Sequence, residues 1–389
     1  MDNVSGLKIA LITTEERETH SRYDLPDPWF GVAPTSLLDG LKQCPDLEVH
    51  VITCVRSPVN MPERLAPNMF CRIVQVPRWG FLRTAYLPCI LKIRRILKAL
   101  RPHIVHGQGT ERFAALAAAF SGYPNVVTLH GIMSDVARVA HARPGSFYWL
   151  TARLESLALR RTLGVFCNSR CTQAAVAPRT SRTWLVPNSV REVFLTPPHP
   201  IEHPTRCLLL NVGVICENKQ QLELLRTARF LWEQKLDFEL HFIGAVDGNS
   251  AYGRAFLDHV RQAERDGYAR YFGPKTAEEL VTCFDRASAL VHTPIVESFG
   301  LVVAEALARN LKFFGFRVGG VPDVVEGGIG TILVEPNDWT GLANAIAGWL
   351  RTGRPAAPQT SNLMRQRYHP LVIARRHREI YGEVLHRHL

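Results

Sequence analysis

The chain has 389 residues, more than one ordinary hydrophobic core supports and about right for two domains of roughly 150–200 residues each. Hydrophobic residues make up 46% and charged residues 21% of the sequence, which excludes an intrinsically disordered protein. The net charge of +11 is spread unevenly: residues 1–195 hold 24 Lys and Arg against 14 Asp and Glu, whereas residues 196–364 hold 16 against 19. Because the positive charge is confined in this way, we expect no nucleic acid partner.

Cysteine usage and the N-terminal stretch bear on the compartment. Nine cysteines, an odd number without metal-ligand spacing, predict neither a disulfide framework nor a zinc site. The apolar run LKIALIT at 7–13 is typical of a strand and is too short for a membrane span. We therefore expect a cytoplasmic protein.

Short apolar runs alternate with longer amphipathic stretches through the first half of the chain. The runs predict strands at 7–13, 47–54, 71–77, 103–106, 125–130, 163–169 and 182–187. Helical spacing of apolar residues lies between most of them, at 34–41, 84–100, 110–120 and 147–162. Strand–helix–strand units of this length form right-handed crossovers on a parallel sheet that is covered on both faces.

The alternation stops at 196–204, TPPHPIEHP, because four prolines in nine residues disfavour both helix and central strand. After this predicted linker, strands are expected at 206–214, 238–245, 269–273, 289–294, 311–316 and 330–334. Residues 370–389 have the spacing of one amphipathic helix, which we expect to pack back on the first domain. We predict an α/β fold in which two doubly wound, Rossmann-like domains, 1–195 and 205–369, face each other across a cleft.

The most informative motif is ESFGLVVAE, which runs from Glu297 to Glu305. It follows a predicted strand, so Glu297 is expected at the carboxyl end of that strand and Glu305 in the helix behind it. The amides of Phe299, Gly300 and Leu301 begin this helix. Unpaired N–H groups and the helix dipole there favour an anion such as a diphosphate.

Glycines and charged residues accompany this motif elsewhere in the chain. In the second half, Gly213 ends a strand shortly before Lys219, and Gly319–Gly320 form a turn after another strand. In the first half, Gly31 precedes a helix and His130 ends a strand. In this order and spacing, the chain resembles the GT-B nucleotide-sugar glycosyltransferases, specifically the retaining family 4, also called glycosyl transferases group 1.

The resemblance implies a role for each matched residue. Glu297 would contact the donor sugar near the reacting carbon, and Glu305 would hold the ribose hydroxyls, since a carboxylate accepts two hydroxyl hydrogen bonds well. Lys219 would neutralise the donor diphosphate, and Gly31 would let the backbone approach phosphate or sugar. His130 would lie beside sugar and acceptor and take part in catalysis.

Four positions depart from the family pattern. Val214 stands where an Arg usually follows the glycine of the lysine loop, and we interpret Arg317 as a substitute donor-binding cation. Ser298 replaces a glycine, and the junction between domains reads Pro187-Asn188-Ser189 instead of Pro-Asn-Gly. Arg191 stands where an acid is common. These departures leave the predicted fold intact and concern the affinity for the donor.

His106 and Gln108, at the end of a predicted strand, are interpreted as lining the acceptor cleft. His103 and His106 lie three apart on that strand and so point to opposite faces, which argues against a metal site. The sequence contains no Asp-x-Asp motif. We expect neither a metal nor another cofactor, because a nucleoside-diphosphate sugar would serve as co-substrate.

These observations together predict a retaining enzyme that moves a sugar from a nucleoside-diphosphate sugar to a hydroxyl group. The acceptor would be a glycan or a lipid-linked molecule in cell-surface polysaccharide or glycolipid biosynthesis. Two alternatives stay open: a sugar-nucleotide epimerase of the same architecture, and a catalytically weak partner subunit of a glycosyltransferase complex, which Val214 favours.

The helix predicted at 84–100 carries the densest positive charge. Its apolar stripe comprises Ile90, Ile93, Leu97 and Leu100. Its basic flanks comprise Lys92, Arg94, Arg95, Lys98 and Arg101. One interpretation is an ordinary sheet-covering helix with solvated charges. The other is contact with anionic lipid headgroups, which would make the enzyme peripheral on the inner face of the membrane.

Overall fold

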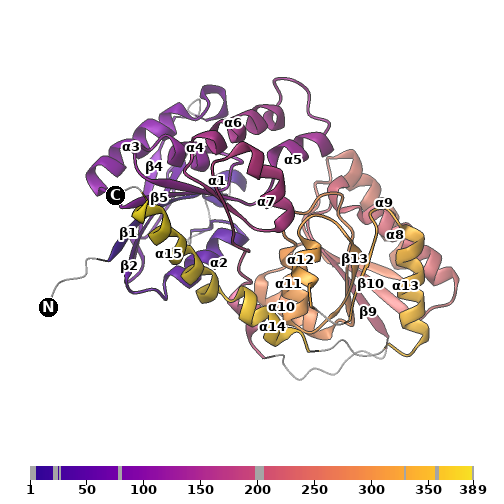
Figure 1. Ribbon diagram of the computed structural model, residues 1–389. Coiled ribbons are helices and arrows are strands. Elements are labelled where there is room, and N and C mark those ends of the chain that lie inside the picture. The colour runs from indigo at the N-terminus through magenta and orange to yellow at the C-terminus, as the bar shows by residue number, and fades with distance from the viewer. Residues whose placement is uncertain are drawn as a thin grey trace. The chain divides into compact units, whose positions relative to one another are not determined.

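The computed structural model describes residues 6–20, 25, 28–77, 81–197, 206–327, 330–354 and 359–387. The chain divides into two compact units (Figure 1). The first, unit 1, combines Met1–Ser189 with Tyr368–Leu389, and the second, unit 2, is Val190–Arg367. None of the helices in the described ranges is both long enough and apolar enough to cross a lipid bilayer.

Unit 1 is built on one sheet in the order β3-β4-β2-β1-β5-β6-β7-β8, parallel except for the β3–β4 pair. The strands are β1 Leu7–Ile12, β2 Leu47–Val55, β3 Arg64–Ala66, β4 Met69–Gln75, β5 Ile104–Gln108, β6 Asn125–Leu129, β7 Val165–Cys167 and β8 Thr183–Leu185. All seven strands predicted in this half are present. The short antiparallel β3 was not predicted, because three residues carry no detectable period.

Helices connect these strands, and two large hydrophobic clusters form on the sheet beside a smaller third one. The helices are α1 Glu16–His20, α2 Val32–Leu41, α3 Leu87–Leu100, α4 Phe113–Ala119, α5 Met133–Val139, α6 Phe147–Arg161, α7 Arg170–Val176 and α15 Pro370–His386. One large cluster contains side chains of α2 and α15, and the other large cluster contains side chains of α3 and α4. Both faces of the sheet are therefore covered, as predicted for a parallel sheet.

The C-terminal helix α15 packs on the first unit, as predicted. It lies beside α2 (Figure 1), and its inner face buries Ile373, Ala374 and Tyr381. Gly40 of α2 permits this approach, because a Cβ there would lie 2.1 Å from the carbonyl oxygen of Pro370. Ordinary van der Waals separation rules out a side chain at that point.

Unit 2 contains one wholly parallel sheet in the order β11-β10-β9-β12-β13-β14. The strands are β9 Cys207–Val212, β10 Phe238–Ile243, β11 Ala269–Tyr271, β12 Ala289–His292, β13 Lys312–Phe316 and β14 Thr331–Val334. The helices are α8 Gln221–Glu233, α9 Ala251–Asp266, α10 Ala277–Arg286, α11 Leu301–Ala308, α12 Val321–Val325, α13 Trp339–Arg351 and α14 Ser361–Tyr368. All six strands predicted in this half are present.

The boundary between the units differs from the predicted end of the first domain at residue 195. The short 3₁₀ helix Glu192–Leu195 belongs to unit 2, where Phe194 is fully buried with its ring 5.5 Å from that of Phe284. The Thr196 carbonyl then accepts a hydrogen bond from Arg309. The units therefore separate at Ser189, because the apolar side chain of Phe194 packs in unit 2, against Phe284. Of the predicted linker 196–204, only residues 196 and 197 lie among the described residues.

Candidate active site

Glu297 lies in the loop between β12 and α11, past the strand end where it was expected. Asn218 anchors this loop with two hydrogen bonds to Val296: its Nδ2 donates to the carbonyl at 3.0 Å, and its Oδ1 accepts from the amide at 2.9 Å. The Ile295 amide also donates to the Asn218 carbonyl at 2.7 Å. The segment before α8 therefore positions the backbone next to Glu297.

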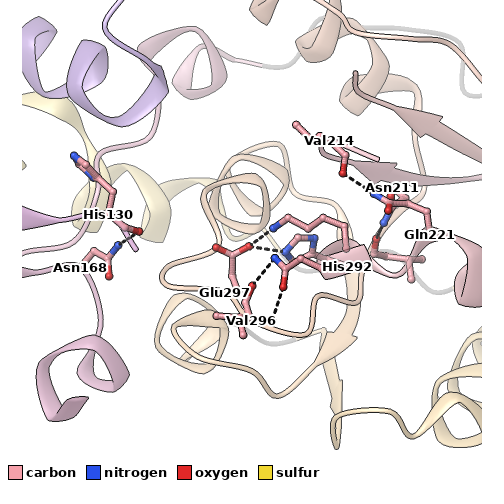
Figure 2. Close-up of polar contacts among 11 residues, drawn as sticks. His130, Asn168, Asn211, Val214, Gln221, His292, Val296 and Glu297 are labelled. Carbon is pink, nitrogen blue, oxygen red and sulfur yellow. Dashed lines mark hydrogen bonds and ion pairs between the residues drawn. The ribbon is translucent and has the colours of Figure 1, made fainter. Parts of the chain in front are cut away.

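Two side chains of unit 2 contact the Glu297 carboxylate, as the dashed lines to it in Figure 2 show. Lys219 Nζ lies 2.7 Å from Oε2, and His292 Nε2 lies 3.1 Å from the same oxygen. Lys219 ends a 3₁₀ turn after β9, and His292 is the last residue of β12, so neighbouring strands present both groups at their carboxyl ends. Ligands of open α/β sheets bind at this edge.

Electrostatics keep this cluster in one charge state. Burial raises the pKa of Glu297, but the Lys219 ammonium and the His292 hydrogen bond outweigh it and hold that pKa well below its usual range. Burial lowers the pKa of His292, although its bond to Glu297 opposes the shift. At neutral pH the site therefore presents an ionised carboxylate between a cation and a neutral imidazole.

The predicted Gly319–Gly320 turn holds the Glu297 backbone. A Cβ on Gly319 would lie 1.6 Å from the Glu297 carbonyl oxygen, and Gly319 has a φ of +53°. The Gly320 amide donates to the same oxygen at 3.1 Å. Only a residue without a side chain permits this contact, which explains the glycine.

Glu305 points into a different environment from Glu297. Its side chain is buried on α11, and Oε1 accepts a hydrogen bond from Arg191 Nε at 2.7 Å. Burial raises the pKa of Glu305, and the Arg191 guanidinium opposes that shift. Arg191 is thus the direct partner of Glu305, the second carboxylate predicted to bind the donor. From the sequence, Arg191 was only a departure from the family pattern.

The start of α11 has the predicted geometry of a helix N-terminus. The helix begins at Leu301, and Gly300 precedes it with a φ of +94°. Phe299 is buried beside this turn. The eight-residue helix thus starts within a few residues of Glu297, as the motif predicts.

Two predicted donor-binding features are less closely joined to this cluster. Val214 is 59% exposed, and its carbonyl is held by Gln221 Nε2 at 3.0 Å (Figure 2), so the loop is ordered without the usual Arg. Arg317 forms an ion pair with Glu335 at 3.2 Å between two exposed side chains. The structure does not connect Arg317 to the Lys219–Glu297 pair.

In unit 1, His130 follows β6 directly and is partly buried. Its carbonyl accepts a hydrogen bond from Asn168 Nδ2 at 3.4 Å (Figure 2), and its Nε2 lies 3.1 Å from Gln108 Oε1. Burial lowers the pKa of His130 to about 4, and the Asn188 side chain opposes this shift. Gly31 precedes α2 with a φ of +80°, so its backbone adopts a conformation that favours glycine.

The interpretation of His106 and Gln108 as cleft-lining residues is wrong. His106 is fully buried on β5, where it hydrogen-bonds Tyr381 of α15 and Thr128 of β6. Gln108 is 3% exposed and contacts the imidazoles of His106 and His130. Both side chains lie on the same face of β5, where α15 contacts His106 through Tyr381, 275 residues away in sequence.

Sequence reasoning also missed His292 and Asn218. A signal for His292 existed, since a polar residue at the carboxyl end of a buried strand commonly faces a ligand site. Asn218 carried no signal apart from its place next to Lys219. Within the described ranges, no three His, Cys, Asp or Glu side chains gather as a metal site requires.

Family models match both halves of the chain. The model described as Glycosyltransferase Family 4 matches residues 35–192, and the model described as Glycosyl transferases group 1 matches residues 199–366. The chain belongs to this family of glycosyltransferases. The second match includes the Lys219–Glu297 cluster and Glu305, and the first includes His130.

Curated relatives match with moderate identity. A D-inositol 3-phosphate glycosyltransferase of Pseudarthrobacter chlorophenolicus is 31% identical over 163 residues, which is 40% of this chain but only 38% of that relative's length. The phosphatidylinositol N-acetylglucosaminyltransferase GPI3 subunit of Saccharomyces cerevisiae is 23% identical over 335 residues, covering 80% of this chain and 71% of that subunit.

Solved structures share the fold across almost the whole chain. Sucrose-phosphate synthase from Thermosynechococcus elongatus superposes with a TM-score of 0.73 at 18% identity, covering 97% of this chain and 98% of that one. Anabaena HepE in complex with UDP-glucose superposes with a TM-score of 0.72 at 16% identity, covering 97% and 99%. The two parallel-sheet α/β units therefore have the GT-B architecture of this glycosyltransferase family.

Proposed function

We propose that the chain transfers a sugar from a nucleoside-diphosphate sugar to a hydroxyl acceptor with retention of anomeric configuration. The Lys219–Glu297–His292 cluster carries this proposal. An ionised carboxylate stabilises positive charge that develops on the reacting sugar carbon. The adjacent ammonium is suited to the negative charge that grows on the leaving diphosphate.

The reaction would be a displacement on the face from which the diphosphate departs. The departing phosphate oxygen takes the proton of the acceptor hydroxyl while the new glycosidic bond forms, so atoms and charge balance. Lys219 and the amides at the start of α11, around Gly300, would stabilise the leaving group. We propose that no metal or other cofactor takes part and that a UDP-sugar is the donor, since a fold neighbour was solved with UDP-glucose.

We further propose an anionic or lipid-linked acceptor, used in cell-surface polysaccharide or glycolipid biosynthesis at the cytoplasmic face of a membrane. Two relatives are named for phosphorylated inositol compounds, which are anionic, and the first half of this chain is strongly basic. On α3, the predicted stripe residues Ile90, Ile93 and Leu97 are buried against the sheet. Leu87 and Leu91 are about half exposed on the same helix, beside its basic residues.

Nucleotide binding is the first test. Thermal unfolding would be measured with UDP, GDP, ADP and dTDP, because a ligand that binds the native state raises its stability in proportion to ln(1 + [L]/Kd). One nucleotide should raise the melting temperature of wild type and do so less in Lys219→Met. Absence of a shift with all four would favour the partner-subunit alternative.

Turnover is the second test. The protein and the matching nucleotide sugar would be followed by NMR with and without candidate acceptors, with Glu297→Gln as the inactive control. Formation of an acceptor glycoside whose anomeric configuration equals that of the donor supports the proposal. Conversion of the donor sugar without any acceptor would identify an epimerase, and an inverted product would contradict the proposed stereochemistry.

A further inference from the structure

A line of buried polar side chains runs through unit 1 from the C-terminal helix to His130. Tyr381 Oη on α15 lies 2.6 Å from His106 Nδ1 on β5. His106 Nε2 lies 3.1 Å from Gln108 Nε2, and Gln108 Oε1 lies 3.1 Å from His130 Nε2. Thr128 Oγ1 of β6 joins the line 2.7 Å from His106 Nε2 and 3.3 Å from Gln108 Nε2. Each contact belongs to one unit.

Donor and acceptor roles along this line are interdependent. An amide oxygen only accepts and an amide nitrogen only donates, so Gln108 Oε1 requires a proton on His130 Nε2. The Gln108 amide group then donates to Thr128 Oγ1, and the Thr128 hydroxyl donates to the single lone pair of His106 Nε2, which Gln108 Nε2 also approaches at 3.1 Å. His106 consequently carries its proton on Nδ1 and donates it to Tyr381.

The opposite orientation of the Gln108 amide is less favourable. It would move the proton of a neutral His130 to Nδ1, which is buried. The Asn188 side chain interacts with the His130 ring, but no group among the described residues accepts from Nδ1 with standard hydrogen-bond geometry. A buried N–H without an acceptor is rarer and more costly than a buried lone pair without a donor. The arrangement in which His130 Nε2 carries the proton leaves only a lone pair at that position.

We propose that Gln108 is a positioning residue that sets His130 in the Nε2–H tautomer, so that Nδ1 offers a lone pair to a substrate hydroxyl. Tyr381 of α15 orients His106, and His106 orients the Gln108 amide. The C-terminal helix α15 thereby determines which ring nitrogen of His130 carries the proton. The effect on transfer rests on the proposed function, whereas the tautomer itself does not.

The tautomer can be observed directly in the full-length protein. Long-range ¹H–¹⁵N correlation spectra of ¹⁵N-histidine-labelled protein at neutral pH distinguish a protonated from an unprotonated ring nitrogen. The His130 signals are assigned by their loss in His130→Gln. We expect protonated Nε2 and unprotonated Nδ1. A proton on Nδ1, or on both nitrogens, overturns the proposal whether or not the protein is an active transferase.

Variants of Gln108 test the consequence. Gln108→Met preserves size but removes the acceptor, so the His130 tautomers should mix and kcat should fall about 10- to 100-fold with little change in KM for the donor. Gln43→Met, an exposed glutamine of the same unit, is the matched control and should behave as wild type. Unchanged tautomer and kcat in Gln108→Met would contradict the proposal.

Gln108→Glu is the second variant, because it keeps an acceptor and adds a negative charge. It should raise the pKa of His130 and so move the acidic limb of the pH profile of kcat to higher pH. Other titratable groups near the ring are His106 on β5 and His377 on α15. Glu111, whose pKa burial raises to about 7, lies close to Gly109, as the His130 ring does. The profile is therefore repeated in a Glu111→Gln background, where the shift should persist. Loss of the shift there would assign it to Glu111 and overturn the role of Gln108.

Discussion

Lys219 and Glu297 form an ion pair with 2.7 Å between Nζ and Oε2, although 78 residues separate them in sequence. The family resemblance assigned these residues to different parts of the donor, the diphosphate and the sugar. Their contact means that each charge stabilises the other: Lys219 keeps the partly buried Glu297 ionised, and Glu297 orients the ammonium. A bound diphosphate would share the cation with this carboxylate.

Replacing Lys219 by Met should therefore both remove the cation for the diphosphate and weaken the ionisation of Glu297. Without the cation, only His292 still opposes the effect of burial, so the pKa of Glu297 rises. We expect a loss of about 10²- to 10³-fold in kcat/KM, as is typical when one charge stabiliser of a transition state is removed. Steady-state kinetics from about pH 5 to 9 would check this, and the variant's activity should rise with pH. Lys235→Met, in the same unit, should match wild type. Full activity of Lys219→Met would remove the cation from the mechanism.

Much of the fold could be predicted from the sequence because parallel strands are buried on both faces. Their apolar runs, such as 206–214 and 311–316, are therefore continuous and easy to locate. The domain boundary was harder. Phe194 stands just before a proline-rich stretch, and local sequence gives no sign that its packing partner is Phe284. Burial partners far along the chain decide such boundaries.

The site was predictable where local geometry determines it and not where distant elements meet. The order of Glu297, the helix start at Leu301 and Glu305 follows from a strand–loop–helix motif. His106 was misplaced because a histidine at a strand end has the same sequence signature whether solvent or another helix covers it. Only the position of Tyr381 on α15 decides between these cases.

Gly319 should tolerate no side chain. An added Cβ would overlap the Glu297 carbonyl oxygen, and the φ of +53° disfavours residues with a Cβ. Gly319→Ala should destabilise the protein by about 2 kcal/mol or more, or displace Glu297 and lower kcat at least tenfold. Chemical denaturation and kinetics would measure both. The control is Gly348→Ala in α13, where a Cβ meets nothing within 4 Å. The free energy of unfolding of this control should rise by up to about 1 kcal/mol. Equal behaviour of the two variants would contradict the proposed packing.

Acid should destabilise unit 1 through its buried histidines. Burial lowers the pKa of His130 and His377 to about 4, from an ordinary value of 6.5. Between about pH 6.5 and 4 the unfolded chain binds protons that the folded one does not, so the free energy of unfolding falls as pH falls through this range. The raised pKa of Glu111 has the opposite effect, because the folded state then binds the extra proton, and it offsets only part of this loss of stability. Melting temperatures from pH 7.5 to 4.5 would show the slope.

One histidine can be isolated with a matched control. His377 Nδ1 bonds the Ile373 carbonyl one turn earlier in α15, and His259 makes the same bond to Ala255 in α9 while remaining exposed. His377→Leu should flatten the acid slope, whereas His259→Leu should leave it unchanged. Identical slopes in both variants would mean that burial of His377 does not cause the pH dependence.

Arg191 should determine the ionisation of Glu305. Burial raises the pKa of Glu305, and the guanidinium 2.7 Å away opposes this. In Arg191→Ala the carboxylate loses its partner, so the variant should lose about 1–3 kcal/mol of stability. A raised carboxyl pKa means that the folded state holds its proton longer, so the loss should be larger at about pH 8 than at about pH 5. Denaturation at both pH values would check this. Arg191→Lys should retain most of the stability, and Arg226→Ala, an exposed arginine, should show no pH-dependent loss.

Helix α3 should bring the protein to anionic membranes. Ile90, Ile93 and Leu97 are buried against the sheet, so the membrane contact would depend on the half-exposed Leu87 and Leu91 and on the exposed basic residues beside them. Each basic residue near a charged surface contributes about 1 kcal/mol, screened by salt. Co-sedimentation with vesicles containing phosphatidylserine should therefore exceed that with pure phosphatidylcholine and fall steeply at high salt.

Removal of three charges from α3 tests whether this helix makes the contact. The variant Arg94→Gln, Arg95→Gln, Lys98→Gln should lose most of its binding to the anionic vesicles, because about 3 kcal/mol of attraction disappears. The matched control, Arg254→Gln, Arg261→Gln, Arg265→Gln, removes the same charge from exposed positions of α9 in unit 2. It should bind nearly as wild type does, since its charges lie on another unit. Equal losses in the two variants would show that net charge alone drives binding, and absence of wild-type binding would leave α3 as a helix that only covers the sheet.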